Sequence, residues 1–220
     1  KKLLLICTIF ISILANSQTT VPGGNVSGNW TLAGSPYLVK NSIVIPKDCT
    51  LTIQPGVKVS FLGHFKLLVQ GRILAIGTEK DRIRFTTDSI KTGWYGIRFD
   101  NTPNSSDSSK IAYSIIEWGS ATNTTGSDML GGGLLFNNFS KVSIRNCAIR
   151  YCTNYQVYCI NSSPHISYTS ISNSKFGGGV WLSDHSTPQI DHCKLYGNKG
   201  VGIRVVLTET ENITIRYNTI

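Results

Sequence analysis

The sequence predicts an all-β fold, a solenoid of stacked parallel strands, because similar segments recur at equal intervals. A short motif of glycine (once glutamine), an aliphatic residue, any residue and an apolar residue recurs after residue 90. Its aliphatic positions are separated by 37, 23, 23 and 23 residues: Ile97, Leu134, Val157, Val180 and Ile203. A period of roughly 20 to 25 residues, too short for a long amphipathic helix, indicates coils that bury their apolar side only by stacking.

A second pattern follows each copy of the first and consists of two aliphatic residues five positions apart. The pairs are Ile111/Ile116, Ile144/Ile149, Ile166/Ile171, Ile190/Leu195 and Ile215/Ile220. Apolar and polar residues alternate around them, which is typical of short strands with one buried side, joined by tight turns. Each period therefore contains at least two strands.

The first half of the chain has the same character with a less regular period. Strand-like segments alternate with turns containing proline or glycine, and they cover residues 43–45, 51–53, 57–61, 67–69, 73–76 and 83–85. We expect about six or seven coils in residues 43–220, stacked at ~4.8 Å, and incomplete at the C-terminal end. Residues 18–42, with Trp30 and Tyr37, are expected to form an N-terminal cap, because an uncovered coil exposes a sheet edge.

The first 17 residues have the features of a secretory signal peptide. Lys1 and Lys2 precede an apolar run from Leu3 to Leu14, and small residues at Ala15 and Ser17 precede the expected cleavage site. The run is too short to span a membrane. We therefore expect a secreted or cell-surface protein without a membrane span after cleavage.

Charge and cysteine content exclude several classes of site. The 21 Lys and Arg against 12 Asp and Glu give a net charge of +9, and loss of Lys1 and Lys2 leaves +7. These charges are scattered, so no nucleic-acid partner is indicated. The cysteines beyond the signal peptide have neither disulfide-framework nor zinc spacing, so we expect buried small apolar side chains and neither a metal nor a cofactor. They are Cys49, Cys147, Cys152, Cys159 and Cys193.

Several segments resemble a known superfamily. The stretch LTIQPGVKVSFLGHFKLLVQGRILAIGTEKDRIRFTT, followed by GWYGIRF, resembles the opening coils of secreted bacterial right-handed parallel β-helix proteins. INSSPHISYTSIS and ENITIRYNTI are similar to repeats of its pectin-lyase-like branch, the carbohydrate-binding and sugar-hydrolase group. The resemblance implies a single-stranded right-handed parallel β-helix over nearly all of the mature chain. It implies no single activity, because this fold carries lyases, hydrolases and adhesins.

One segment contains a concentration of reactive side chains, Asp184-His185 and Asp191-His192-Cys193. In a solenoid, equivalent residues of successive coils stack in columns, so each can be compared with its neighbours. Asp184 continues a column of asparagines at a turn, where stacked amides bond from coil to coil. The other columns contain mixed residues, so we interpret the cluster as scaffold. The Asp184 column is Asn101, Asn138 and Asn161; the His192 column is Tyr113, Asn146, Tyr168 and Tyr217; the Asp191 column is Ala112, Arg145, Ser167 and Arg216.

The columns contain no catalytic arrangement of the kinds that the resemblance implies. Lyases of this fold hold calcium with carboxylates on adjacent coils and use an Arg or Lys base, and the hydrolases use close aspartates. Here Glu117 is followed in its column by Arg150, Ser172 and Tyr196. We predict no catalytic residue; the alternative is a polysaccharide lyase or glycoside hydrolase whose site lies partly beyond residue 220.

The outward column of the first motif is the predicted ligand surface. It contains Arg98, Leu135, Tyr158, Trp181 and Arg204, so two aromatic side chains on adjacent coils are flanked by arginines. Such a surface can stack sugar rings or pair with acidic groups. The alternative is that a neighbouring loop or domain covers the aromatics. We expect a structural or ligand-binding domain whose partner is a polysaccharide or cell-surface glycan.

Overall fold

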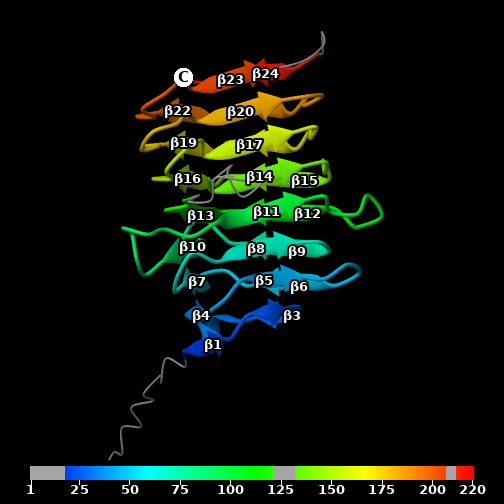
Figure 1. The fold of residues 1–220 in the computed structure, drawn as a ribbon, viewed down its shortest axis with the longest axis vertical. Coiled ribbons are helices and arrows are strands. Elements are labelled where there is room, and N and C mark those ends of the chain that lie inside the picture. Colours follow the sequence, from blue (N-terminus) through cyan, green and yellow to red (C-terminus); the bar gives the residue numbers. More distant parts are fainter. Residues whose placement is uncertain (1–17, 121–131, 207–211) are drawn as a thin grey trace, which may run out of the picture.

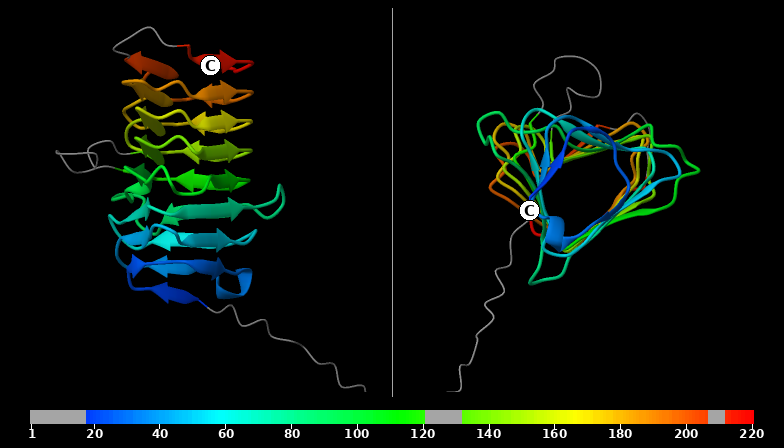
Figure 2. Two further views of the ribbon diagram at one scale, coloured as in Figure 1. Left: turned by 90° about the vertical axis from the view of Figure 1, so that its right-hand side faces the viewer. Right: turned by 90° about the horizontal axis from the view of Figure 1, so that it is seen from below.

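The computed structural model describes residues 18–120, 132–206 and 212–220, and these form a single stack of coils (Figure 1). The predicted signal peptide lies outside the described residues. Every strand pairs in parallel with its equivalents one coil away, which gives three sheets of eight strands each. Seen end-on, the three sheets form the walls of a roughly triangular tube (Figure 2).

We call the three sheets A, B and C in the order in which the chain visits them. Sheet A contains β1 (Thr19–Val21), β4 (Tyr37–Val39), β7 (Lys58–Phe61), β10 (Ile83–Thr87), β13 (Ser114–Glu117), β16 (Ala148–Arg150), β19 (Ser170–Ser172) and β22 (Lys194–Tyr196). Sheet B contains β2 (Gly24–Asn25), β5 (Ile43–Ile45), β8 (Lys66–Val69), β11 (Gly96–Asp100), β14 (Leu134–Asn137), β17 (Val157–Ile160), β20 (Val180–Ser183) and β23 (Ile203–Val206). Sheet C contains β3 (Gly28–Trp30), β6 (Thr50–Ile53), β9 (Arg72–Ile76), β12 (Ser109–Ala112), β15 (Val142–Arg145), β18 (His165–Ser167), β21 (Gln189–Asp191) and β24 (Thr214–Arg216).

The predicted solenoid is confirmed, and residues 43–220 supply the 20 strands from β5 to β24, which make between six and seven coils as expected. The three eight-stranded sheets make eight coils in all because residues 18–42, which were expected to cap the stack, also form strands. They instead supply β1 to β4 and a short 3-10 turn, Leu32–Gly34, so they extend the solenoid by one coil and begin the next. These strands have two or three residues each, and four of the five residues of β2 and β3 are glycine or asparagine, so their sequence lacks an aliphatic period.

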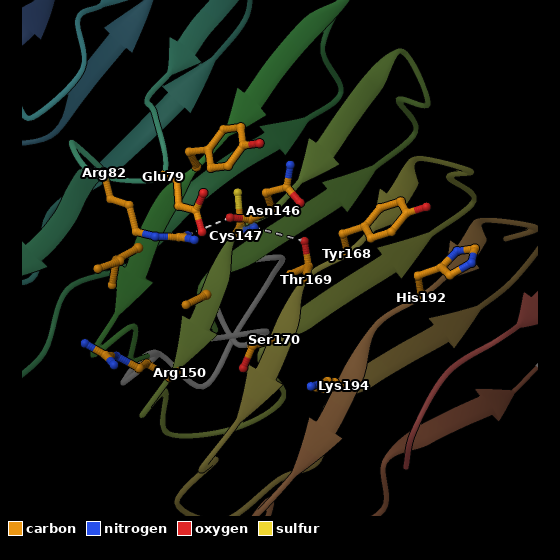
Figure 3. Close-up of a pocket in the computed structure, with 13 residues that line it drawn as sticks. Glu79, Arg82, Asn146, Cys147, Arg150, Tyr168, Thr169, Ser170, His192 and Lys194 are labelled. Atoms are coloured by element: carbon orange, nitrogen blue, oxygen red, sulfur yellow. Dashed lines mark hydrogen bonds between the residues drawn. The ribbon is translucent and has the colours of Figure 1, made fainter.

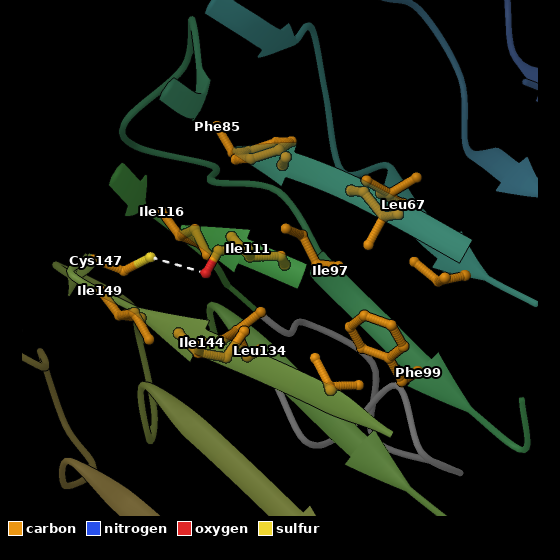
Figure 4. Packing of buried hydrophobic residues seen from close by; sticks show 14 of the residues in the cluster. Leu67, Phe85, Ile97, Phe99, Ile111, Ile116, Leu134, Ile144, Cys147 and Ile149 are labelled. Carbon is orange, nitrogen blue, oxygen red and sulfur yellow. Dashed lines mark hydrogen bonds between the residues drawn. The ribbon is translucent and has the colours of Figure 1, made fainter. Parts of the chain in front are cut away.

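The core fills the tube with columns of aliphatic and aromatic side chains (Figure 4). Ile97 is in register with Leu134, which pairs with Val157 and then Val180, and each of these is fully buried. Ile111 and Ile144 form an equivalent column in sheet C, as do Ile116 and Ile149 in sheet A. Full burial of one such side chain stabilises the fold by about 1.5–3 kcal/mol, so the stacked columns supply the main driving force.

Single residues in the left-handed region make most of the sharp turns between sheets. Asn101, Asn138 and Asn161 occupy the turn from sheet B to sheet C with φ of 51°, 56° and 45°. The amide of Asn138 donates to Asn101 Oδ1 at 2.7 Å, and the amide of Asn161 donates to Asn138 Oδ1 at 2.8 Å. Asp184, φ 53°, continues the column. The predicted asparagine ladder is therefore confirmed, and asparagine suits it because its short polar side chain tolerates this conformation.

Candidate ligand-binding groove

A groove of about 600 Å³ runs over the outer face of sheet A (Figure 3). Its floor is the outward column Ile115, Ala148 and Ser170, which the parallel register places on successive coils. Alanine and serine in two consecutive coils leave the face hollow, because their side chains do not reach the height of the neighbouring columns.

One wall of the groove is formed by the turn from sheet C to sheet A. Tyr113, Asn146, Tyr168 and His192 occupy it, all with positive φ. The Tyr168 and His192 rings stack with centroids 4.7 Å apart, and Tyr217 continues the stack at 5.1 Å from His192. Bulky residues in the left-handed region are unusual. Here the ring contacts between coils, which are favourable, offset that cost and present a row of phenol and imidazole edges.

The opposite side of the groove is formed by Arg150, whose side chain is fixed by the buried carboxylate of Glu117. Glu117 is 1% exposed and accepts two hydrogen bonds from Arg150, Nε at 3.0 Å and Nη2 at 2.9 Å. Its other oxygen accepts from Arg84 Nε at 2.7 Å and from the Thr86 hydroxyl at 3.0 Å. Two-pronged arginine pairing is strong and directional, so it fixes the Arg150 side chain along the groove.

Charged groups lie at both ends of the groove. Glu79 and Arg82, from the turn before β10, lie at one end, and Arg82 Nη1 donates to the carbonyl of Asn146 at 2.6 Å. Lys194 of β22 lies at the other (Figure 3). The lining therefore carries three permanent cations and one carboxylate, together with His192.

Asp191 lies next to the wall and is enclosed by its neighbours. Its Oδ1 accepts from His165 Nε2 and Gln189 Nε2, both at 2.9 Å, and its Oδ2 accepts from His192 Nδ1 at 3.0 Å. Burial raises the pKa of Asp191, but the hydrogen bonds from His192, His165 and Gln189 lower it more, to about 2. The sequence places Asp191 in an outward column, and the structure shows that these side chains leave it only 6% exposed.

The structure brings the predicted ligand residues into one column of sheet B but covers part of it. Arg98, Tyr158, Trp181 and Arg204 are in register through Leu135. Arg98 is 1% and Tyr158 is 5% exposed, whereas Trp181 is half-buried and Arg204 is exposed. The expectation that Tyr158 is exposed is therefore wrong.

The cover over Tyr158 comes from within the same coil. The Tyr155 ring meets Tyr158 and Trp181 edge-on, with centroid distances of 5.5 and 5.3 Å. The Arg204 guanidinium lies 4.8 Å from the Trp181 ring centroid, over its face. Burial raises the pKa of the Tyr158 phenol. That this column binds a ligand stays a prediction, now restricted to Trp181 and Arg204.

Comparison with known proteins supports the architecture. The sequence model of the family described as "Right handed beta helix region" matches residues 116–220, which lie within the three parallel eight-stranded sheets. This chain is a right-handed parallel β-helix repeat protein. The β-helix is also 32% identical over 77 residues to Protein bark beetle of Drosophila melanogaster, a match that covers 34% of this chain and 2% of that protein. No solved structure gives a significant match.

The described residues of the β-helix offer no metal-binding cluster, and their cysteines are free thiols. These residues contain no cluster of three or more His, Cys, Asp or Glu side chains placed to hold a metal. Within the same ranges, no helix is long and apolar enough to cross a membrane. Four of the five described cysteines are buried free thiols, as expected, and Cys49 is half-buried. Cys147 lies beneath the groove, where burial raises the pKa of its thiol to about 12.

The groove was missed by sequence reasoning although its wall was visible there. Sequence alignment places Tyr113, Asn146, Tyr168, His192 and Tyr217 in one column, as the structure does, but predicts for it only a scaffold role. The signal was the recurrence of aromatic residues where a turn favours asparagine or glycine. The hollow floor had no such signal, because alanine and serine are common on any exposed strand.

Proposed function

We propose that this β-helix is a secreted or cell-surface ligand-binding domain that takes a carbohydrate chain along the groove on sheet A. The observation that carries the proposal is the groove itself, a hollow over successive coils with a small-residue floor and a wall of ring edges. A lining that repeats with every coil suits a ligand that is itself a repeating polymer.

The chemistry of the lining supports a sugar ligand. Phenol, imidazole, amide and hydroxyl groups of Tyr168, His192, Asn146 and Ser170 can exchange hydrogen bonds with sugar hydroxyls. The groove is open rather than enclosed, so a long chain could enter it sideways. The apolar edges of the stacked rings can contact the C–H faces of a pyranose.

Two features of the sequence support the location and ligand class. The signal-peptide features of residues 1–17 support export. The resemblance of later coils to the carbohydrate-binding and sugar-hydrolase group of secreted bacterial β-helices supports a glycan.

The experiment is a glycan array followed by titration of groove-filling variants. We expect the full chain to bind at least one oligosaccharide, and Ser170→Trp to weaken binding by about tenfold or more, because an indole on the floor occupies the hollow. The control is Thr52→Trp, a half-buried outward residue of β6 that does not line the groove, which should bind as the wild type does. No binding to neutral or acidic glycans, or equal binding by both variants, would contradict the proposal.

A further inference from the structure

We infer that the groove takes an anionic ligand at its His192 end and that protonation of His192 and His165 strengthens this capture as the pH falls. The inference rests on the proposed function, because it names the ligand class and the regulation of the same groove.

The structural basis is one carboxylate shared by two imidazoles. Asp191 accepts from His165 on one oxygen and from His192 on the other, at 2.9 and 3.0 Å. An ionised carboxylate only accepts hydrogen bonds, so the nitrogen of each ring that faces it carries the proton. The remaining ring nitrogen of each histidine is then the one that takes up a second proton. Both side chains are 42% exposed, so solvent protons can reach them.

The charge of this cluster changes sign with the protonation of its two imidazole rings. With both rings neutral, the three side chains carry −1 from Asp191. With both protonated, they carry +1. Histidine is the side chain that ordinarily makes this change between pH 5 and 8. Asp191 stays ionised throughout, since its hydrogen bonds hold its pKa at about 2 despite burial.

The other charged residues around the groove determine how the net charge of this cluster affects the binding of an anion. Lys194 lies on the same coil, two residues beyond His192, and lines the groove. Arg216 of β24 is in register with Asp191, and Arg145 of β15 lies 4.4 Å from the Tyr168 ring centroid. At the far end, Arg82 is accompanied by Glu79, and Arg150 is paired with Glu117. Among the residues that the structure describes, Asp191 is therefore the one carboxylate that we identify at the His192 end, and protonation of both histidines outweighs its charge.

His192 connects the cluster to the ligand surface. Its ring forms part of the groove wall and is stacked between Tyr168 and Tyr217. A proton on this ring therefore places positive charge directly on the wall, while the proton on His165 acts through the shared carboxylate.

The test compares two ligands with the same sugar backbone, one with charged and one with uncharged carboxyl groups. Binding of an oligogalacturonate and of its fully methyl-esterified form is measured by calorimetry at pH 7.5 and 5.5. The galacturonate carboxyls stay ionised at both values. We expect the acidic ligand to bind roughly threefold to tenfold more tightly at pH 5.5, as suits partly screened surface charges, and the gain to shrink at high salt. The ester should bind equally at both pH values.

The variants use residues that this chain already places at equivalent positions. His192→Asn reproduces Asn146 of an earlier coil and keeps a residue that tolerates the φ of 53°. His165→Gln reproduces Gln189, its register partner. Each should reduce the pH dependence for the acidic ligand, and the double variant should remove it. His64→Gln, at a histidine outside the groove, should leave it unchanged.

The outcomes separate this inference from the function on which it rests. Equal affinity for the acidic ligand at both pH values, binding of the ester alone, or full pH dependence in the double variant would overturn the inference while leaving glycan binding intact. Failure of both oligosaccharides to bind at either pH, together with a silent glycan array, would overturn both.

Discussion

The outer faces of sheets A and B are built on the same coils with the same register, yet one is hollow and the other is filled. On sheet A, Ala148 and Ser170 lie between a wall of turn residues and an anchored Arg150. On sheet B, Tyr158 and Trp181 occupy adjacent coils, and Tyr155 packs across both. Large aromatic side chains on neighbouring coils therefore bury one another, and small side chains between taller columns make the more accessible surface.

The sheet A face depends most on the buried carboxylate of Glu117. We expect Glu117→Gln to lower the free energy of unfolding by about 3 kcal/mol, because Arg84 and Arg150 lose a charged partner that is 1% exposed. Chemical denaturation measures this. The matched control is Glu79→Gln, an exposed groove residue, for which we expect a change within about 0.5 kcal/mol. Equal midpoints for the two variants would mean that the ion pairs do not hold this face.

The proposal of a groove on sheet A competes with the sequence prediction that Trp181 and Arg204 bind the ligand, so on this proposal the sheet B face contributes to stability rather than to binding. Trp181→Ala is expected to cost about 2 kcal/mol, less than for a fully buried tryptophan, since the half-buried ring loses contacts with Tyr155 and Tyr158. Glycan affinity should stay within about twofold of wild type. Trp181→Phe should recover part of the stability. A large loss of glycan affinity in a stable Trp181→Ala protein would contradict this expectation. It would indicate that the sheet B column predicted from the sequence binds the glycan.

The turns that set the angle between the faces can be tested at Asn138. Asn138→Ala removes two ladder hydrogen bonds and places alanine at a φ of 56°, so we expect a cost of about 1–2 kcal/mol. Asn138→Gly removes the same hydrogen bonds but adopts this φ freely, so its cost should be smaller. Thermal unfolding of the two variants separates the contributions. A glycine variant as unstable as the alanine variant would assign the whole effect to the hydrogen bonds.

The smallest expected effect is the acid stability that Asp191 supplies beside the groove. Its folded pKa is about 2 and its ordinary value 3.8, so the ionised carboxylate stabilises the fold above about pH 4 and loses this effect as the pH falls to 2. After allowance for solvent screening the contribution is on the order of 1 kcal/mol. Asp191→Asn should therefore be less stable than wild type at pH 6, and the gap should close by pH 2. A constant gap across this range would contradict the assignment.

The equal 23-residue intervals predicted the register of the C-terminal coils, because apolar columns stack only when equivalent residues align. The number of strands per coil was harder to obtain. Ile111 and Ile116 both point inward although five positions separate them, because Tyr113 between them adopts a φ of 46° and divides the segment into β12 and β13. The odd spacing is the trace that this corner leaves in the sequence, and the pattern alone predicted only that each period contains at least two strands.

The functional surfaces depended on side-chain shapes from several coils, which column alignment does not report. Tyr158 was correctly placed in an outward column, but Tyr155, only three residues earlier, covers it from the turn. To predict the groove, the side-chain sizes of Ile115, Ala148 and Ser170 would similarly have to be compared with those of the turn residues beside them. Position follows from the repeat, whereas exposure follows from packing.

The C-terminal coils share one length of 23 residues, so the molecule could gain or lose whole coils there. Residues 157–179 form one complete period, and their removal would join Gln156 to Val180, where Val180 already has the register of Val157. Every remaining strand would still find a neighbour, and the tube would shorten by one step of ~4.8 Å. Duplication of a coil would lengthen it by the same step. A lineage could thus adjust the length of the proposed binding face in whole coils, by recombination at matching points and without redesign of the core.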